Sequence, residues 1–275
     1  MLSGFKFPIE KEIYALTIFK DIIIVGGNFK YIHIFTNGSV REKKVNSNVL
    51  SLTNDNINNI YVGFEDGNIL ILNSNFKKIN LFFTNQDKID CLLFVNKFNL
   101  LFSGCKENKG IQVWNKEGKY ITTLAEEYGS YPAILNYSLT FPYLYSAHKN
   151  NGITVWNIET KKYNNYIETN NKVVNMVSYK DNLILGELDG FIRIKNERNF
   201  ITKFSFEIKF NIYSLNVFND NIIVGTNGIL KFYDFKGKHE KDKIIHDTNI
   251  HILQIKNNKI YTSSKDNSYK IIEKV

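Results

Sequence analysis

One pattern recurs along the whole chain: a short apolar run that ends in a small residue, then a polar turn and a second β-rich run. The small residues are Gly26, Gly63, Gly104, Ala147, Gly186, Gly225 and Ser263. They follow one another at intervals of 37, 41, 43, 39, 39 and 38 residues. A period of this size is typical of architectures that copy one supersecondary unit. Seven such units fill nearly all of the 275 residues and leave no length for a second domain.

Each unit contains four short segments. The first is apolar, as in "IYALTIF" from Ile13, and the second is β-branched and ends in the small residue. The third reads "YIHIF", "NILIL" or "FIRIK", and the fourth is polar, as in "SVREKKV" at 39–45. Such runs between Asn, Asp and Lys turns predict β-strands, and no helical period is sustained. A sheet with two apolar faces cannot bury either face alone. We therefore predict an all-β chain: a seven-bladed β-propeller of four-stranded antiparallel blades, with residues 1–275 as a single domain.

The two ends of the chain complement each other. The last unit begins at Ile250 and stops at Val275 after its third segment, whereas a spare segment, "SGFKFPI" at 3–9, precedes the first unit. We predict that this N-terminal strand closes the last blade as its fourth strand, so that the blade has no missing edge.

The third segments carry a resemblance to a known family. "IQVWN" at 111–115 and "ITVWN" at 153–157 resemble the closing phrase of WD repeats, with Asn in place of the usual Asp, and "KFYD" at 231–234 keeps the Asp but replaces the Trp. Short polar residues match the family's turn aspartate, six positions before the Trp site: Asp66, Asp189, Asp266, Asn108, Asn150 and Asn227. The resemblance implies a divergent WD40 β-propeller. Quinoprotein-type repeats, which "IYVGFEDGNILILN" also resembles, are the alternative.

The family's hydrogen-bonded network of His, Ser or Thr, Asp and Trp should depart from its usual form. No Gly-His pair precedes any first segment. We therefore expect this network to be absent or incomplete.

No catalytic or metal-binding motif stands out. The five histidines (His33, His148, His239, His246 and His251) show no HExxH pattern and no zinc-ligand spacing with Cys91 or Cys105. Nucleophile-elbow, Walker and dinucleotide-binding glycine patterns are missing too. We therefore expect no enzymatic activity, no cofactor and no metal, with both cysteines as free thiols.

Charge and the N-terminus bear on partners and compartment. The first residues lack the apolar stretch of a signal peptide, and no segment is apolar enough to span a membrane. We therefore expect a cytoplasmic protein, with the nucleus as the alternative. We also expect the protein to be monomeric on its own. The net charge is +8 and the pI about 9.1. The lysines of the chain are concentrated in the fourth segments, where they are expected to prevent exposed sheet edges from pairing with other chains. RNA or an anionic phospholipid surface is the alternative partner for this basic rim.

The resemblance also implies a binding site at the mouth of the propeller channel. In WD-repeat proteins the second residue of each first strand lines that mouth, which here gives Tyr14, Leu50, Asp90, Leu135, Val174, Tyr213 and His251. The residue seven before each Trp position lines it as well, which gives Asn28, Glu65, Glu107, Lys149, Leu188, Thr226 and Lys265. Two tyrosines among aliphatic residues suit a peptide, although the aliphatic residues could instead plug the channel. We predict a non-catalytic scaffold that binds protein or peptide partners on a face or the rim, as a subunit of a larger assembly.

Overall fold

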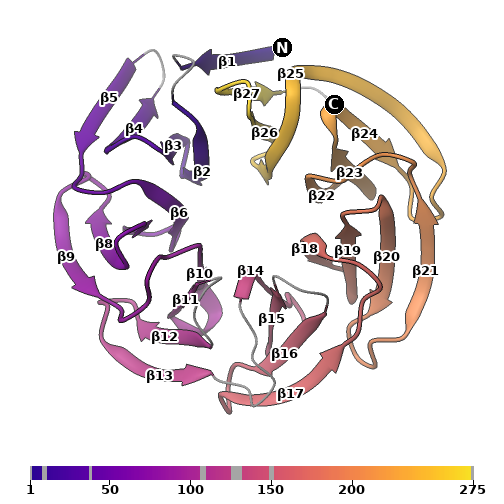
Figure 1. The fold of residues 1–275 in the computed structure, drawn as a ribbon, viewed down its shortest axis with the longest axis horizontal. Helices are drawn as coiled ribbons and strands as arrows, with labels where there is room; N and C mark the ends of the chain where they lie inside the picture. Colours follow the sequence, from indigo (N-terminus) through magenta and orange to yellow (C-terminus); the bar gives the residue numbers. More distant parts are fainter. Residues whose placement is uncertain are drawn as a thin grey trace. The chain divides into compact units, whose positions relative to one another are not determined.

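The structure is a computed structural model that describes residues 2–7, 11–36, 39–105, 110–124, 132–148 and 152–273. Within these ranges it contains 27 β-strands joined by short connections (Figure 1). The helical content of the same ranges is one short 3-10 turn, η1 (Asn96–Phe98), and no helix in them is long and apolar enough to cross a membrane. The all-β prediction is confirmed.

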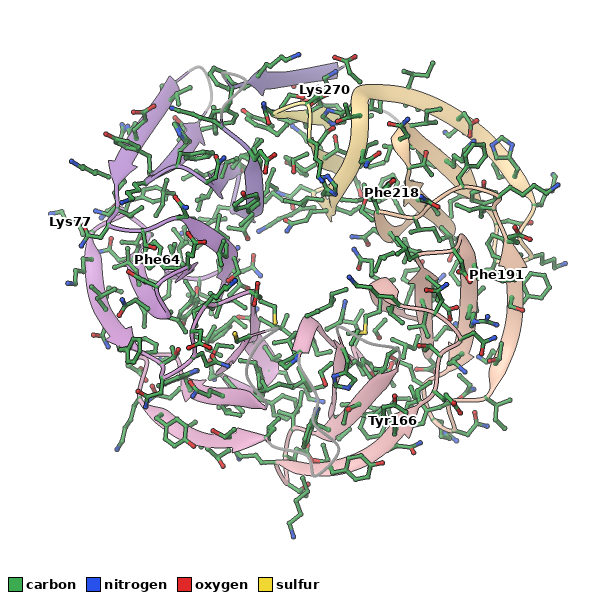
Figure 2. All side chains as sticks on the ribbon, in the orientation of Figure 1. Phe64, Lys77, Tyr166, Phe191, Phe218 and Lys270 are labelled. Carbon is green, nitrogen blue, oxygen red and sulfur yellow. The ribbon has the colours of Figure 1, made fainter. Side chains whose placement is uncertain are left out.

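The chain forms two compact units. The first unit comprises Ile13–Leu135 and Leu144–Tyr166, and the second comprises Met1–Glu12, Asn136–Tyr143 and Ile167–Val275. In Figure 2, Phe64 lies in the interior of the first unit, whereas Lys77 extends from its outer edge into solvent. Each unit has its own apolar interior, since the buried cluster around Phe64 lies in the first unit and the cluster around Ile184 lies in the second.

Three sheets lie in the first unit, each with its four strands in chain order. They are β2 (Ile13–Phe19), β3 (Ile22–Gly27), β4 (Tyr31–Thr36) and β5 (Ser39–Lys44); β6 (Val49–Asn54), β7 (Asn59–Phe64), β8 (Asn68–Asn73) and β9 (Lys78–Phe83); and β10 (Cys91–Val95), β11 (Leu100–Gly104), β12 (Ile111–Asn115) and β13 (Tyr120–Leu124). The boundary between the units runs through a fourth sheet: β14 (Pro132–Tyr137), β15 (Tyr143–His148), β16 (Ile153–Asn157) and β17 (Lys162–Ile167).

The second unit contains one four-stranded sheet and one seven-stranded sheet. The four-stranded sheet is β18 (Val173–Tyr179), β19 (Asn182–Glu187), β20 (Phe191–Asn196) and β21 (Thr202–Glu207). The other contains β22 (Ser214–Phe218), β23 (Asn221–Gly225), β24 (Asn227–Tyr233), β25 (His239–Lys256), β26 (Lys259–Ser264), β27 (Ser268–Ile272) and β1 (Leu2–Lys6). The 18-residue β25 pairs with β24 through its first part and with β26 through its last part. It therefore ends one blade and begins the next, so the chain contains the seven four-stranded groups that were predicted.

The N-terminal strand completes the last of these groups. β1 pairs antiparallel with β27, from Leu2 opposite Ile272 to Lys6 opposite Ser268 (Figure 1). The next residue, Phe7, is buried, and its N–H donates a 2.7 Å hydrogen bond to the carbonyl oxygen of Asn267. The predicted closure of the last blade by the N-terminal strand is confirmed.

Close packing of consecutive sheets explains the repeated small residue. A Cβ atom on Gly26 would lie 2.3 Å from Cγ1 of Val49, and one on Gly225 would lie 3.0 Å from Cβ of Ile250. Val49 and Ile250 are both fully buried: Val49 begins the first strand of the next blade, and Ile250 begins the part of β25 that pairs within the next blade. The glycines thus allow one sheet to approach the next more closely than any side chain would permit.

This packing predicts a difference between two glycine substitutions. At Gly63 a new Cβ would lie 2.5 Å from Cγ2 of Ile89 before the next sheet, whereas at Gly186 the nearest atom would be a methyl of Ile212 at 3.0 Å. Alanine reduces the entropy of the unfolded chain equally at both sites, so the clash decides the difference. We expect Gly63→Ala to lower the free energy of unfolding by about 1–3 kcal/mol. Gly186→Ala should change it by less; equal shifts in urea midpoints would contradict this explanation.

The Asn residues in place of the WD aspartate are explained by turn geometry. The side-chain oxygen of Asn115 accepts hydrogen bonds from the N–H groups of Glu117 and Lys119, at 3.1 and 2.7 Å. The carboxylate of Asp234 accepts from the N–H groups two and four residues further on, each at 2.8 Å. The turn requires an acceptor and no charge, so an amide oxygen serves as well as a carboxylate.

Candidate functional site

Four of the predicted mouth residues share one backbone feature. In four sheets the ladder between the first and second strands skips one residue near its start, and the skipped residues are Tyr14, Leu50, Val174 and His251. A residue at such a β-bulge is left out of the ladder, and the bulge redirects its side chain. These four carried-over positions are therefore equivalent in their backbone structure.

The other three predicted residues lie at or near the start of the first strand of their own sheets. Asp90 and Tyr213 directly precede β10 and β22, and Leu135 lies within β14. Tyr14 is 43% exposed, and the remaining six of the seven residues are half-buried. The first unit contains Tyr14, Leu50, Asp90 and Leu135, and the second contains Val174, Tyr213 and His251.

The second predicted set is less uniform. Glu65 accepts a 2.8 Å hydrogen bond from the side chain of Asn48. Thr226 is 2% exposed, and its hydroxyl donates to the carbonyl oxygen of Ile229. Asn28, Leu188 and Lys265 lie in the described ranges, whereas Glu107 and Lys149 lie outside them.

Two of the predicted residues contact each other in the second unit. The rings of Tyr213 and His251 meet edge to face, with centroids 5.8 Å apart and planes at 80°. Burial lowers the pKa of His251, and the nearby Lys265 lowers it further, while Glu12 acts in the opposite direction. The imidazole is therefore neutral at pH 7. Its Nε2 is buried and has no hydrogen-bond partner among the described residues, which leaves one polar atom at this site unsatisfied.

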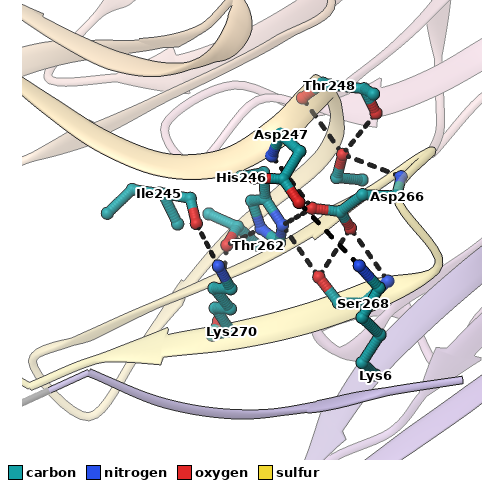
Figure 3. Close-up of polar contacts among 10 residues, drawn as sticks. Lys6, Ile245, His246, Asp247, Thr248, Thr262, Asp266, Ser268 and Lys270 are labelled. Carbon is teal, nitrogen blue, oxygen red and sulfur yellow. Dashed lines mark hydrogen bonds and ion pairs between the residues drawn. The ribbon is translucent and has the colours of Figure 1, made fainter.

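A network of polar side chains lies elsewhere in the second unit (Figure 3). Nδ1 of His246 lies 2.9 Å from a carboxylate oxygen of Asp266, and Nε2 lies 2.8 Å from the hydroxyl of Thr262. Because a carboxylate only accepts, Nδ1 carries the proton and Nε2 accepts from the hydroxyl. Burial lowers the pKa of His246, and Asp266 only partly offsets this. Burial acts to raise the pKa of Asp266, but hydrogen bonds from Ser268 and other groups keep it below its usual value.

A cavity of about 290 Å³ borders this network, between β1 and the turn before β27. Its charged groups already have partners: Nζ of Lys6 lies 3.8 Å from Asp247, and Lys270 donates to the carbonyl oxygen of Ile245 (Figure 3). Because each charged side chain of this cavity already has a polar partner, the cavity forms a structural connection between β1 and its neighbours.

Metal-binding groups of side chains and disulfides are both absent from the described ranges. These ranges contain no group of three or more His, Cys, Asp or Glu residues arranged to hold a metal ion. Cys91 and Cys105 form no disulfide.

Comparison with solved structures identifies the fold. No protein-family model and no curated protein matches the sequence. A chain in a crystal structure of a mitotic checkpoint complex aligns with a TM-score of 0.84 at 15% identity, over 98% of this chain and 90% of that one. The WD40 β-propeller domain of Doa1 aligns with a TM-score of 0.82 at 14% identity, over 98% and 94%. The chain has a WD40 β-propeller fold. The computationally designed Ika8 protein is also similar, with a TM-score of 0.70 at 19% identity over 95% and 96%.

As a WD40 propeller, the chain retains the His, Thr and Asp of the family's network in its last blade, with Ile272 at the Trp position. The network is thus incomplete, as expected. Sequence reasoning nevertheless missed His246, because Ile245 stands where a Gly-His pair has glycine. The four-residue spacing from His246 to the buried Ile250 was the signal that could have found it.

The third blade has a different variant of this network. Nε1 of Trp114 donates to the hydroxyl of Ser103 at 3.0 Å, and that hydroxyl donates to Oε1 of Gln86 at 2.8 Å. Gln86 thus takes the role of the family's histidine. All three residues are buried, so the network ties the strands of this blade to the segment that enters it.

Proposed function

We propose that this propeller is a non-catalytic scaffold that binds protein or peptide partners, as a subunit of a larger assembly. The observation that carries the proposal is the repeated β-bulge, which presents Tyr14, Leu50, Val174 and His251 at equivalent strand ends. One of the similar folds comes from the structure of a complex, which is consistent with this role. We further propose that the protein is cytoplasmic and monomeric on its own.

The chemistry of the second-unit residues favours a peptide. The Tyr213 ring offers apolar area together with a hydroxyl, a combination enriched at protein interfaces. The neutral His251 beside it has an unsatisfied Nε2, and a peptide amide or carbonyl group could complete its hydrogen bonding. Neither side chain carries a charge that would select an anion.

The test is capture of partners by a variant that lacks both tyrosines. We expect Tyr14→Ala with Tyr213→Ala to reduce the recovery of specific partners, measured by quantitative mass spectrometry after affinity purification from the source cell, by about tenfold or more. The thermal midpoint should stay close to that of the wild type, because both side chains are at least partly exposed.

Tyr163→Ala provides the matched control, since Tyr163 is 52% exposed on the outer strand β17. This variant should retain every partner. If the double variant captures the same partners as the wild type, Tyr14 and Tyr213 do not contribute to partner binding.

A further inference from the structure

A second surface lies in the first unit, between its first two sheets. A groove of about 200 Å³ runs between the end of β5 and the outer strand β9. Phe64, Leu70 and Leu81 form its apolar floor, and Lys43, Lys44 and Lys78 stand around it. This volume is below the roughly 300–1,000 Å³ of small-molecule pockets and suits a single large side chain.

The groove is a place where the core between two sheets reaches the surface. Phe64 and Leu70 belong to the apolar cluster that packs β2–β5 against β6–β9. Leu81 lies directly opposite Leu70 in the β8–β9 ladder and therefore on the same face, yet it is 40% exposed. The cluster stays uncovered here because the β5 residues on the same face are polar: Arg41 and Lys43 pair with Ile34 and Ile32 of the cluster.

Strand β9 presents an apolar face beside the groove. The β9 residues that face the third sheet already contact it. The ring centroids of Phe82 and Trp114 are 4.8 Å apart, and the Asn80 side chain donates to the carbonyl oxygen of Glu117. The alternate residues Leu81 and Phe83 point the opposite way and are 40% and 58% exposed. β9 is also the edge strand of its sheet. An exposed apolar edge strand is a site where another chain can add, and proteins normally avoid one.

The charges around this apolar floor are unbalanced. Lys43, Lys44 and Lys78 have no ion-pair partner in the described part of the chain. Of the groove's described lining residues, Asp66 alone is acidic, and its carboxylate already accepts the N–H of Asn68. The groove is therefore complementary to a negatively charged occupant.

We infer that this groove binds an extended acidic segment of a protein partner. One large apolar side chain of the segment enters over Leu81, its carboxylates face Lys43, Lys44 and Lys78, and its backbone follows the free edge of β9. A peptide fits better than a nucleic acid, because the floor around Leu81 is mainly aliphatic and the cations are lysines, whereas single-stranded nucleic acid is held by stacking on aromatic rings.

The experiment selects ligands from random linear peptides displayed on phage, using the full chain as bait. We expect the enriched peptides to combine Asp or Glu with Leu, Ile or Phe. The most enriched peptide is then synthesised with a fluorophore, and its Kd is measured by anisotropy. Lys43→Glu with Lys44→Glu, and separately Leu81→Asp, should each raise the Kd by about tenfold or more.

Two controls make the effect specific to the groove. Ile121→Asp places the same charge at a residue of matching exposure, 41%, on the outer strand β13, and Lys162→Glu reverses an exposed lysine on β17. Neither should change the Kd. Tyr14→Ala with Tyr213→Ala should leave the Kd unchanged too, which separates the groove from the proposed binding positions at these two tyrosines.

Three results would overturn the inference: no enrichment of any peptide, enriched peptides without an acidic excess, or binding that survives Leu81→Asp. A fluorescent oligouridylate is measured in parallel. If it binds with a steep salt dependence, and the lysine reversals abolish its binding while Leu81→Asp does not, the surface is a nucleic-acid site instead.

Discussion

Deletion of residues 2–7 is expected to lower the free energy of unfolding by about 5 kcal/mol or more, because it removes the outer strand of the last blade. Phe7 is 4% exposed, and truncating a buried Phe alone costs about 3–5 kcal/mol. The deletion also removes the five residue pairs between β1 and β27 and leaves β27 as an open edge. In a chain of this size the thermal midpoint should fall by about 10 °C or more.

Single substitutions separate the contributions to this loss. Phe7→Ala should account for most of it. Lys6→Ala removes only a 3.8 Å ion pair whose side chains are 63% and 81% exposed, so it should leave the midpoint almost unchanged. Calorimetry or thermal circular dichroism gives the comparison. A deletion variant that unfolds at the wild-type temperature would show that β1 does not hold the last blade together.

Replacing Arg193 by Leu is expected to lower the free energy of unfolding by about 3–5 kcal/mol, because it leaves a buried carboxylate uncompensated. Nε of Arg193 lies 2.7 Å from Oε1 of Glu187, with side-chain exposures of 18% and 0%. Oε2 of Glu187 has no hydrogen-bond partner within the described ranges. The arginine is therefore the main compensation for this charge.

The double variant Glu187→Leu with Arg193→Leu should recover most of that loss, because it removes both charges together. Lys180 and Asp220 serve as a control: their atoms are as close, at 2.6 Å, but both side chains are 64% exposed. Lys180→Ala should therefore have little effect on the urea midpoint. An Arg193→Leu variant as stable as the wild type, or a double variant no better than the single one, would contradict the role of burial.

The candidate site was predictable only in part. Counting one position into each first strand located Tyr14, Leu50, Val174 and His251, because the repeats are collinear and equivalent positions share a backbone environment. The bulge at these positions was not predictable, since a bulge depends on the register between two strands and not on the letters of one. The contact between Tyr213 and His251 joins residues 38 positions apart in adjacent blades and carries no local signal.

The amino-acid sequence alone determined the all-β class, the seven blades and the origin of the last strand, because turn residues, strand alternation and the small residue at each sheet contact act locally and recur with every copy. Tertiary structure alone decided which unlike side chains meet: Gln86 in the place of a histidine, the pairing of Arg193 with Glu187, and the uncovered floor beside Leu81. These depend on distances between strands that the period does not encode. Residues of different types can make the same hydrogen bond or leave the same surface exposed. The contacts of such residues are therefore known only when the packing of the strands is known.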